Sequence, residues 1–300
     1  MKKAKFLSVV AIVAAMAFTS CNNVINDIAD GSSQEAVKFS AGIEATPKAP
    51  TYASGTSWAP GDSIGIFMVK NGTFDISLGA ENKKYTTVAG NSSFTASNGD
   101  IYYPMSGDVD FIAYYPWQDN QDLTDPYEVD VSDQSNPAEI DLLWAMADNN
   151  GNGYNSGSVA LVFSHMLTRI VLTAEPGGGL TAVDLAGMTA KISGMNTKAD
   201  FDLMDGELDT PTDVANIDLQ YVSGKYEAIL VPQLVALDAM EVTFTLDNGA
   251  GEFVWKVPAT TFDSGKEYTY TITLNRSGEI TFTGTINPWL TEDGGTGIAE

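Results

Sequence analysis

The chain is poor in the residues that most often carry chemistry, with one cysteine, one histidine and two arginines among its 300 residues. The single thiol, Cys21, forms no internal disulfide, so stability must come from hydrophobic cores. His165 alone supports neither a metal site nor a Ser-His-Asp triad without partners from elsewhere in the chain. H-E-x-x-H and phosphate-binding glycine motifs are also missing. We therefore expect a packed structural histidine, no catalytic residue, no metal site and no cofactor.

Basic residues are scarce compared with acidic ones. The sequence has 15 lysines and arginines against 39 aspartates and glutamates, a formal net charge of −24 at pH 7. Nucleic acids and anionic membranes are bound by basic surfaces, so the charge argues against both as partners. The acidic residues are spread along the chain, which predicts solvated faces of strands and turns. The hydrophobic content of 44% is sufficient for real cores.

The one long apolar run is at the N-terminus, from Phe6 to Phe18, and is too short for a membrane-spanning helix, which needs ~20 residues. Three lysines precede it, and the small residues Thr19 and Ser20 follow it, directly before Cys21. This order is typical of an export signal. We expect residues 1–20 to be a signal peptide cut between Ser20 and Cys21.

A lipid on the Cys21 thiol is the expected consequence of that cleavage, and it anchors a protein without any membrane span. Removing residues 1–20 with their lysines changes the formal net charge to −27. Residues 21–36 are polar and rich in turn-forming residues. They are therefore expected to be a lipidated flexible tether between the membrane and the fold.

From Val37 onward the sequence predicts β-structure. Val37, Phe39, Ala41 and Ile43 alternate with polar or small residues, as in a strand with one buried face. The same period is clearest in EYTYTITL, residues 267–274, where tyrosines, an isoleucine and a leucine alternate with threonines and a glutamate. Further short strands are expected at 64–69, 109–115, 159–163, 170–174, 226–231, 241–246, 252–257 and 279–286. Gly, Asn, Asp, Ser and Pro clusters separate them, which favours β-sandwiches.

One segment, AEIDLLWAMA, has helical spacing, because Ile140, Leu143, Trp144 and Ala147 fall at i, i+3, i+4 and i+7. It predicts either a short helix or an irregular buried segment. The longest turn-rich interruption follows it, from residue 148 to residue 158. We place a boundary there, between β-sandwiches at 37–155 and 156–300.

Several sequence motifs occur in a fixed order: VKFSAGI, WAPGDSIGIF, IYYP, VDFIAYYPW, DLLWA, LVFSHMLTRI, ILVPQ, FDSGKEYTYTITLN and a last strand ending in Trp289. With the lipidation cysteine, they resemble the fimbrillin-family lipoproteins of the Bacteroidales, whose members include type V pilus subunits. The resemblance implies an all-β fold of two transthyretin-like β-sandwich domains in tandem after the signal peptide. It also implies a surface-exposed protein of the outer membrane and fimbrium.

The same resemblance implies assembly by strand exchange with other fimbrial subunits, after proteolytic removal of an N-terminal segment. Carried onto this chain, the displaced strand contains Val37, Phe39, Ala41 and Ile43. The stretch directly after it, residues 46–58, contains no arginine, and Lys48 is the sole basic residue between Lys38 and Lys70. Lys48 is therefore the candidate cleavage site, and a segment that stays in place would mark a terminal or anchoring subunit, or a protein that is no pilin. The candidate donor strand contains Ile280, Phe282 and Ile286, and its alternative is the last strand of the second sandwich.

Two other patterns leave alternatives open. Asp148, Asn150, Asn152 and Gly153 match the opening of a calcium loop, but the twelfth position is Val159, so a linking turn is favoured. A group of aromatic residues is expected mainly in core and turn packing, although they could stack on sugars: Tyr102, Tyr103, Phe111, Tyr114, Tyr115 and Trp117.

Two alternative functions follow from these features. The first is a monomeric surface lipoprotein that binds glycans or host ligands, and surface ligands on host or bacterial cells are candidate partners in either case. The second is a hydrolase that uses a carboxylate pair, since 39 acidic residues are available.

Overall fold

The fold is all-β, as the sequence predicts. The computed structural model describes residues 34–44, 57–247, 251–278 and 280–289, which lie in one compact unit, Gln34–Glu300. The predicted signal peptide, Cys21 and Lys48 lie outside the described residues. Among those residues, the helix content is one turn, α1 (Pro137–Ile140), and no helix is long and apolar enough to cross a membrane.

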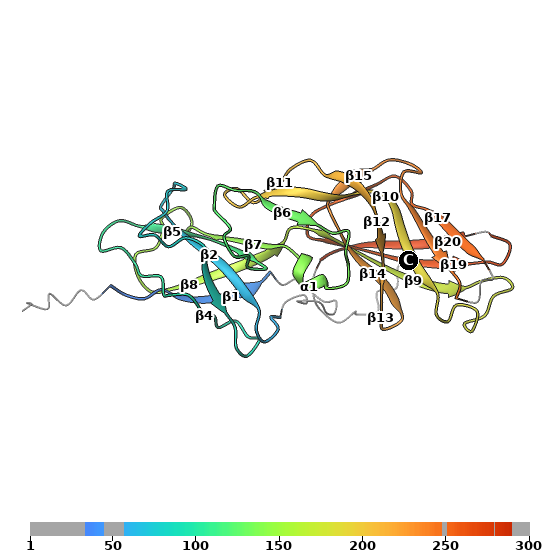
Figure 1. Ribbon diagram of the computed structural model, residues 1–300, viewed down its shortest axis with the longest axis horizontal. Coiled ribbons are helices and arrows are strands. Elements are labelled where there is room, and N and C mark those ends of the chain that lie inside the picture. The colour runs from blue at the N-terminus through green and yellow to red at the C-terminus, as the bar shows by residue number, and fades with distance from the viewer. Residues whose placement is uncertain (1–33, 45–56, 248–250, 279, 290–300) are drawn as a thin grey trace, which may run out of the picture. The chain divides into compact units, whose positions relative to one another are not determined.

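The first sheet has seven strands in the order β1-β8-β7-β5-β2-β3-β4 (Figure 1). The strands are β1 (Lys38–Ile43), β2 (Ser63–Lys70), β3 (Lys83–Thr86), β4 (Thr95–Ala96), β5 (Val109–Tyr115), β7 (Leu143–Ala147) and β8 (Ser158–His165). β1 pairs with β8 in parallel, whereas the other neighbours are antiparallel. A buried cluster, here called the first core, includes Phe39, Trp58, Ile66, Phe111 and Phe163.

Two further sheets enclose a second core, which includes Phe201, Phe244, Trp255, Tyr268 and Ile272. One sheet contains β6 (Tyr127–Asp130), β10 (Thr189–Asp202), β11 (Glu207–Leu208), β12 (Thr212–Asp218), β16 (Glu241–Thr245) and β17 (Glu252–Lys256). The other, in the order β13-β14-β9-β19-β20, contains β9 (Thr168–Pro176), β13 (Gln220–Val222), β14 (Lys225–Leu230), β19 (Lys266–Leu274) and β20 (Ile280–Pro288). A small sheet pairs β15 (Gln233–Val235) with β18 (Thr260–Phe262).

The strands β2 and β5 are buried on both faces, and their alternating side chains divide between the two cores. Ile64, Ile66 and Met68 of β2 lie in the first core, whereas Phe67 and Val69 lie in the second. A strand covered on both faces needs a nearly continuous apolar sequence, and SIGIFMV provides one. β2 and β5 therefore contribute side chains to both cores.

The helical interpretation of AEIDLLWAMA is wrong beyond its first turn. α1 ends at Ile140, and Leu143–Ala147 forms β7, in which Leu143, Ala145 and Ala147 are buried. Residues at i and i+4 share a face in a strand as well as in a helix, so the spacing of Leu143 and Ala147 fits both. Pairing with β5 and β8 fixes the extended form.

Strand pairing does not change at the predicted boundary between residues 155 and 156. β8 comes after that position but pairs with β1 and β7, and its buried residues lie in the first core. β6 comes before it but pairs with β10 of the second sheet. The turn-rich stretch 148–157 is therefore a connection between two strands of the first sheet, β7 and β8.

Candidate strand-exchange site and surface pockets

β1 is an edge strand of the first sheet, and among the described residues its only ladder of hydrogen bonds is the one with β8. Its register with β8 runs from Lys38 opposite Ser158 to Ile43 opposite Phe163. Along its other side, isolated backbone bonds replace a ladder: Val37 N donates to Ile101 O at 2.9 Å and Ala41 N donates to Ser92 O at 2.9 Å. The backbone of β1 is thus held continuously along one edge and at separate points along the other.

The side chains of β1 alternate as the sequence predicts. Val37, Phe39, Ala41 and Ile43 are buried in the first core, and the intervening residues are exposed. The Phe39 ring makes edge contacts with Tyr85 at 5.0 Å and Phe111 at 5.2 Å between centroids. Loss of β1 would leave both a row of unpaired backbone groups on β8 and an apolar groove.

Trp58 contributes a contact to β1 that sequence reasoning missed. Its Nε1 donates to the Ala41 carbonyl oxygen at 2.8 Å, and its ring makes edge contacts with Phe94, Tyr115 and Phe163. A buried tryptophan usually finds a partner for its N–H group. Trp58 opens the WAPGD motif, which was the available signal that this position is special.

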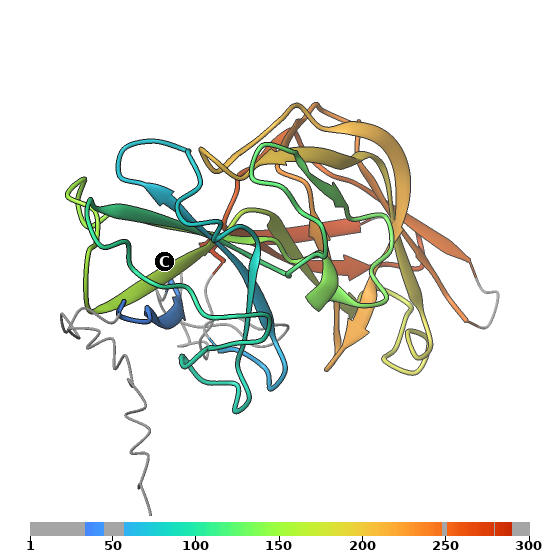
Figure 2. The same ribbon diagram turned by 60° about the vertical axis from the view of Figure 1, so that its left-hand side comes forward.

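β20 is paired over its whole length but poorly covered. All nine of its residues pair with β19, from Ile280 opposite Leu274 to Pro288 opposite Lys266; Figure 2 shows these two orange-red strands side by side. Phe282 and Ile286 share the face of β19 that carries the second core, yet they are 44% and 60% exposed. β20 is therefore both the last described strand and an edge strand that exposes apolar side chains.

Gly284 allows β20 to lie close to β19. It pairs with Tyr270, and a Cβ at this position would lie 2.5 Å from Tyr270 Cδ1. Any larger residue would push the strand away from its neighbour. The ring of Tyr270 thus requires a glycine at position 284, between Phe282 and Ile286.

Trp289 fixes the end of β20. Its indole stacks on the His165 ring, with 4.3 Å between centroids and 11° between planes, and the backbone N–H of Trp289 donates to Gly265 O at 2.6 Å. His165 is buried, and its Nδ1 lies 2.9 Å from Asp141 Oδ1. The packed, hydrogen-bonded structural role predicted for the lone histidine is what the structure shows.

We expect Trp289→Ala to loosen β20 without unfolding the cores, because the stack is made at the end of the described strand. Amide hydrogen exchange over residues 280–288 should accelerate at least about tenfold, as the loss of about 1.4 kcal/mol of local stability would give. Ile286→Ala is the control, since that side chain is mostly exposed. Equal exchange in both variants would contradict the anchoring role of Trp289.

The aromatic group and the candidate calcium loop occupy ordinary packing and turn positions. Tyr103, Phe111, Tyr114 and Tyr115 are buried, which confirms core packing for them, while Tyr102 is exposed and Trp117 is half-buried. The Asp148–Gly153 stretch is a turn in which Asn150 N donates to Asp148 Oδ1 at 3.0 Å and Gly153 N donates to Asp148 O at 2.8 Å. Among the described residues, no group of three or more His, Cys, Asp or Glu is placed to hold a metal ion.

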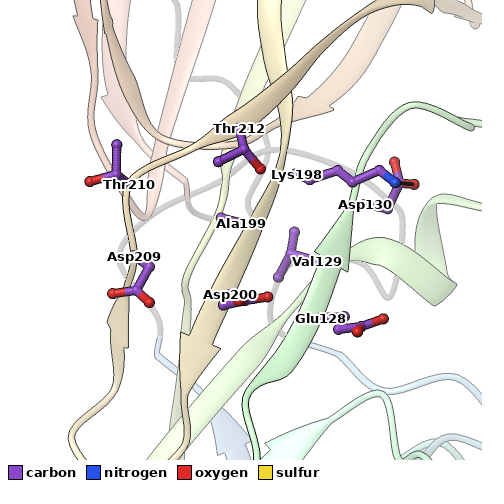
Figure 3. A pocket seen from close by; sticks show the side chains of 9 residues that line it. All are labelled: Glu128, Val129, Asp130, Lys198, Ala199, Asp200, Asp209, Thr210 and Thr212. Atoms are coloured by element: carbon purple, nitrogen blue, oxygen red, sulfur yellow. Dashed lines mark ion pairs between the residues drawn. The ribbon is translucent and has the colours of Figure 1, made fainter.

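A cavity of about 560 Å³ lies between β6, β10 and the segment before β12. Four carboxylates line it, with one ammonium: Glu128, Asp130, Asp200, Asp209 and Lys198 (Figure 3). Lys198 Nζ is 3.5 Å from Asp130. Partial burial raises the pKa of Asp130, but hydrogen bonds from Ser132 and the nearby Lys198 charge outweigh it and lower the pKa below its ordinary value. The cavity has an acidic lining, which is unsuited to anions.

Comparisons with known proteins are consistent across sequence and structure. The sequence model of the fimbrillin-like family matches residues 51–289. A protein of Bacteroides uniformis named "Putative fimbrium subunit Fim1C" is 36% identical over 264 residues, covering 83% of this chain and 85% of the relative.

Solved structures give the same fold. A crystal structure of a "putative cell adhesion protein" from Bacteroides uniformis has a TM-score of 0.71 and 32% identity, covering 85% of this chain and 99% of that one. Another from Bacteroides ovatus has a TM-score of 0.67 and 21% identity, covering 87% and 100%. The tip fimbrial protein Mfa3 from Porphyromonas gingivalis has a TM-score of 0.53 and 9% identity, covering 85% and 100%.

Proposed function

This chain belongs to the fimbrillin-like family, and we propose that it is a structural subunit of a cell-surface fimbria that assembles by strand exchange. The proposal extends to its attachment: a lipid on Cys21 anchors the chain to the outer membrane. The work is done by backbone pairing and burial of apolar side chains, and no step of catalysis is needed.

The observation that carries the proposal is the arrangement of β1. It is an edge strand with every second side chain buried, and it pairs with a strand more than a hundred residues away in the sequence. A segment that leaves the sheet from an edge disturbs no ladder other than its own. β1 can therefore be exchanged while β8, β7 and β5 keep their pairing.

The groove that is left when β1 departs favours one kind of incoming strand. The β8 edge offers unpaired N–H and C=O groups, and the rings of Tyr85, Phe111 and Phe163 line an apolar groove. An incoming strand with apolar side chains at alternate positions satisfies both, as in β-strand addition. Ile280, Phe282 and Ile286 of β20 have this spacing, and two of the three are already exposed.

A donor at the C-terminal end and an acceptor at the N-terminal end make a head-to-tail interface. Such an interface does not close on itself, and so it generates a filament. β20 from one subunit would fill the groove left by β1 of the next. Partners of this chain are then other fimbrial subunits with the same two features.

Cleavage at Lys48 is the proposed trigger, since this lysine follows β1 by a few residues. We expect a lysine-specific protease to release the β1 segment from the lipid-free protein and to start polymerisation. Size-exclusion chromatography and electron microscopy measure the product. Lys48→Gln should stay monomeric under the same treatment.

Lys38→Gln is the matched control, because it makes the same change of charge at an exposed position of β1 itself. It should be cut and should polymerise like the unaltered chain. Polymers from Lys48→Gln would exclude this cleavage site. Clean removal of the β1 segment without any polymer would exclude strand exchange as the means of assembly.

A further inference from the structure

A second cavity, of about 410 Å³, lies beside Trp117, at a distance in the sequence from both β1 and β20. Three loops form it: the one between β2 and β3, the one after β4 and the one after β5. Its lining includes Asn82, Asn98, Trp117, Asp119 and Asn120. It is an open surface pocket with a single aromatic ring among amide and carboxylate groups.

The core holds the Trp117 ring in place. Trp117 is half-buried and packs against the second core, and its backbone N–H donates to Ser63 O at 3.0 Å. Its buried Nε1 has no hydrogen-bond partner among the described residues. Lys84 Nζ lies 4.1 Å from the ring centroid. A cation–π contact at a partly exposed site is weak, so a ligand can displace Lys84 from the ring.

The polar groups around the ring are partly fixed and partly available. The Tyr114 hydroxyl donates to Asn82 Oδ1 at 2.7 Å, and Asn82 Nδ2 donates to Gln118 O at 2.9 Å, so this wall is rigid. Asn98 Oδ1 accepts a bond from Lys84 N, which leaves its Nδ2 without a partner among the described residues. Asp119 and Asn120 are exposed, and their side chains make no hydrogen bonds with the described residues. Both donors and acceptors are therefore available to a ligand.

These groups match the surface of a sugar ring. A pyranose has an apolar C–H face that packs on an indole, and hydroxyls that each donate and accept a hydrogen bond. Three carboxylates near the pocket, Glu81, Asp119 and Asp122, outnumber the Lys84 ammonium. This charge repels sialic acids, uronic acids, sulfates and phosphates.

We propose that this pocket binds a neutral pyranose unit of a surface oligosaccharide, with the sugar ring against Trp117 and its hydroxyls bonded to Asn98, Asp119 and Asn120. The pocket contains no residue of β1 or β20. Binding is therefore independent of assembly, and it gives a fimbrial subunit a means of adhesion along with its structural role.

The test uses the lipid-free chain of residues 22–300, which includes the whole compact unit that begins at Gln34. It is applied to an array of oligosaccharides that end in glucose, galactose, mannose or N-acetylglucosamine, with sialylated and sulfated glycans beside them. The strongest neutral hit is then titrated by calorimetry. We expect binding to at least one neutral glycan and no preference for the acidic ones.

Variants assign that binding to the pocket. Trp117→Ala should weaken it about tenfold or more, and Asp119→Asn about threefold or more. Asp209→Asn makes the same charge change in the acidic cavity of Figure 3 and should leave the affinity within about twofold. Because Trp117 also contacts the core, circular dichroism and thermal unfolding check its variant, and the exposed Asp119 carries the test if that variant misfolds.

Three outcomes would overturn the proposal. The first is no binding to any neutral glycan at about 1 mM, a concentration that detects even weak sites. The second is binding confined to acidic glycans. The third is a neutral glycan bound with unchanged affinity by both Asp119→Asn and a folded Trp117→Ala.

Discussion

Replacing Arg169 with methionine will lower the free energy of unfolding by about 3–5 kcal/mol, the cost of breaking a buried ion pair by removing one partner. Arg169 lies in β9 between two neighbouring strands, and its guanidinium reaches a glutamate on each. Its Nη2 is 2.6 Å from Glu227 Oε2 on β14, and its Nη1 is 3.0 Å from Glu267 Oε2 on β19. All three side chains are buried, so the substitution leaves two carboxylates without their cation.

Arg276→Met is the matched control for that measurement. Arg276 is the other arginine of the chain, its side chain is 62% exposed, and it lies 3.7 Å from Asp184. An exposed pair contributes about 0–1 kcal/mol. Denaturant unfolding followed by tryptophan fluorescence compares the two variants. A similar loss of unfolding free energy in both variants would show that the buried ion pairs of Arg169 contribute no more to stability than the exposed one of Arg276.

Phe39→Ala should also cost about 3–5 kcal/mol, because it removes a fully packed ring from the first core and leaves a cavity that the surrounding sheet cannot fill. The lost packing is that of β1, and one continuous ladder of hydrogen bonds, the one with β8, holds the backbone of this strand. We therefore expect the β1 segment to open more readily, and the uncut variant to accept a donor strand at a measurable rate. Unfolding curves give the first effect, and incubation with purified peptide 278–289 gives the second.

Phe282→Ala provides the control, since it makes the same change on β20, where the ring is 44% exposed. Its loss of stability should be smaller, about 60% of that for Phe39→Ala, because the two residues are 44% and 6% exposed and the loss scales with the apolar surface that each one buries. Peptide 278–289 should bind the uncut Phe282→Ala protein no better than the unaltered chain. Rapid binding of the peptide to both the Phe282→Ala protein and the unaltered chain would place the acceptor site somewhere other than the groove of β1.

The sequence was sufficient for features that depend on a local pattern. Tyr268, Tyr270, Ile272 and Leu274 alternate with polar residues, and this period by itself requires a strand with one buried face. Val37 to Ile43 follow the same rule, and both segments are strands with the predicted side chains inside. The single histidine could be assigned a structural role because the sequence has no second histidine with which to build a metal site.

Features that depend on distant pairing were not accessible. Leu143 and Ala147 satisfy both a helical and an extended pattern, and the choice is made by the neighbouring β5 and β8. The same non-local pairing places β8 in the first sheet and β6 in the second, against the boundary that turn composition suggested. The contacts of Trp58 with Ala41 and of Trp289 with His165 join segments that no local pattern connects.

The parallel pairing of β1 with β8 has a mechanical consequence. β1 receives the chain from its N-terminal side, and β8 leads from its C-terminal end through residues 166 and 167 into β9 of the other core. Because the two strands point the same way, a pull on the chain before β1 and the resistance of the rest of the fold act in opposite directions along one ladder. The bonds between them are then loaded together, in shear, instead of being opened one after another like a zipper. A subunit that keeps β1 in place thus resists a pull that is applied to the chain before β1.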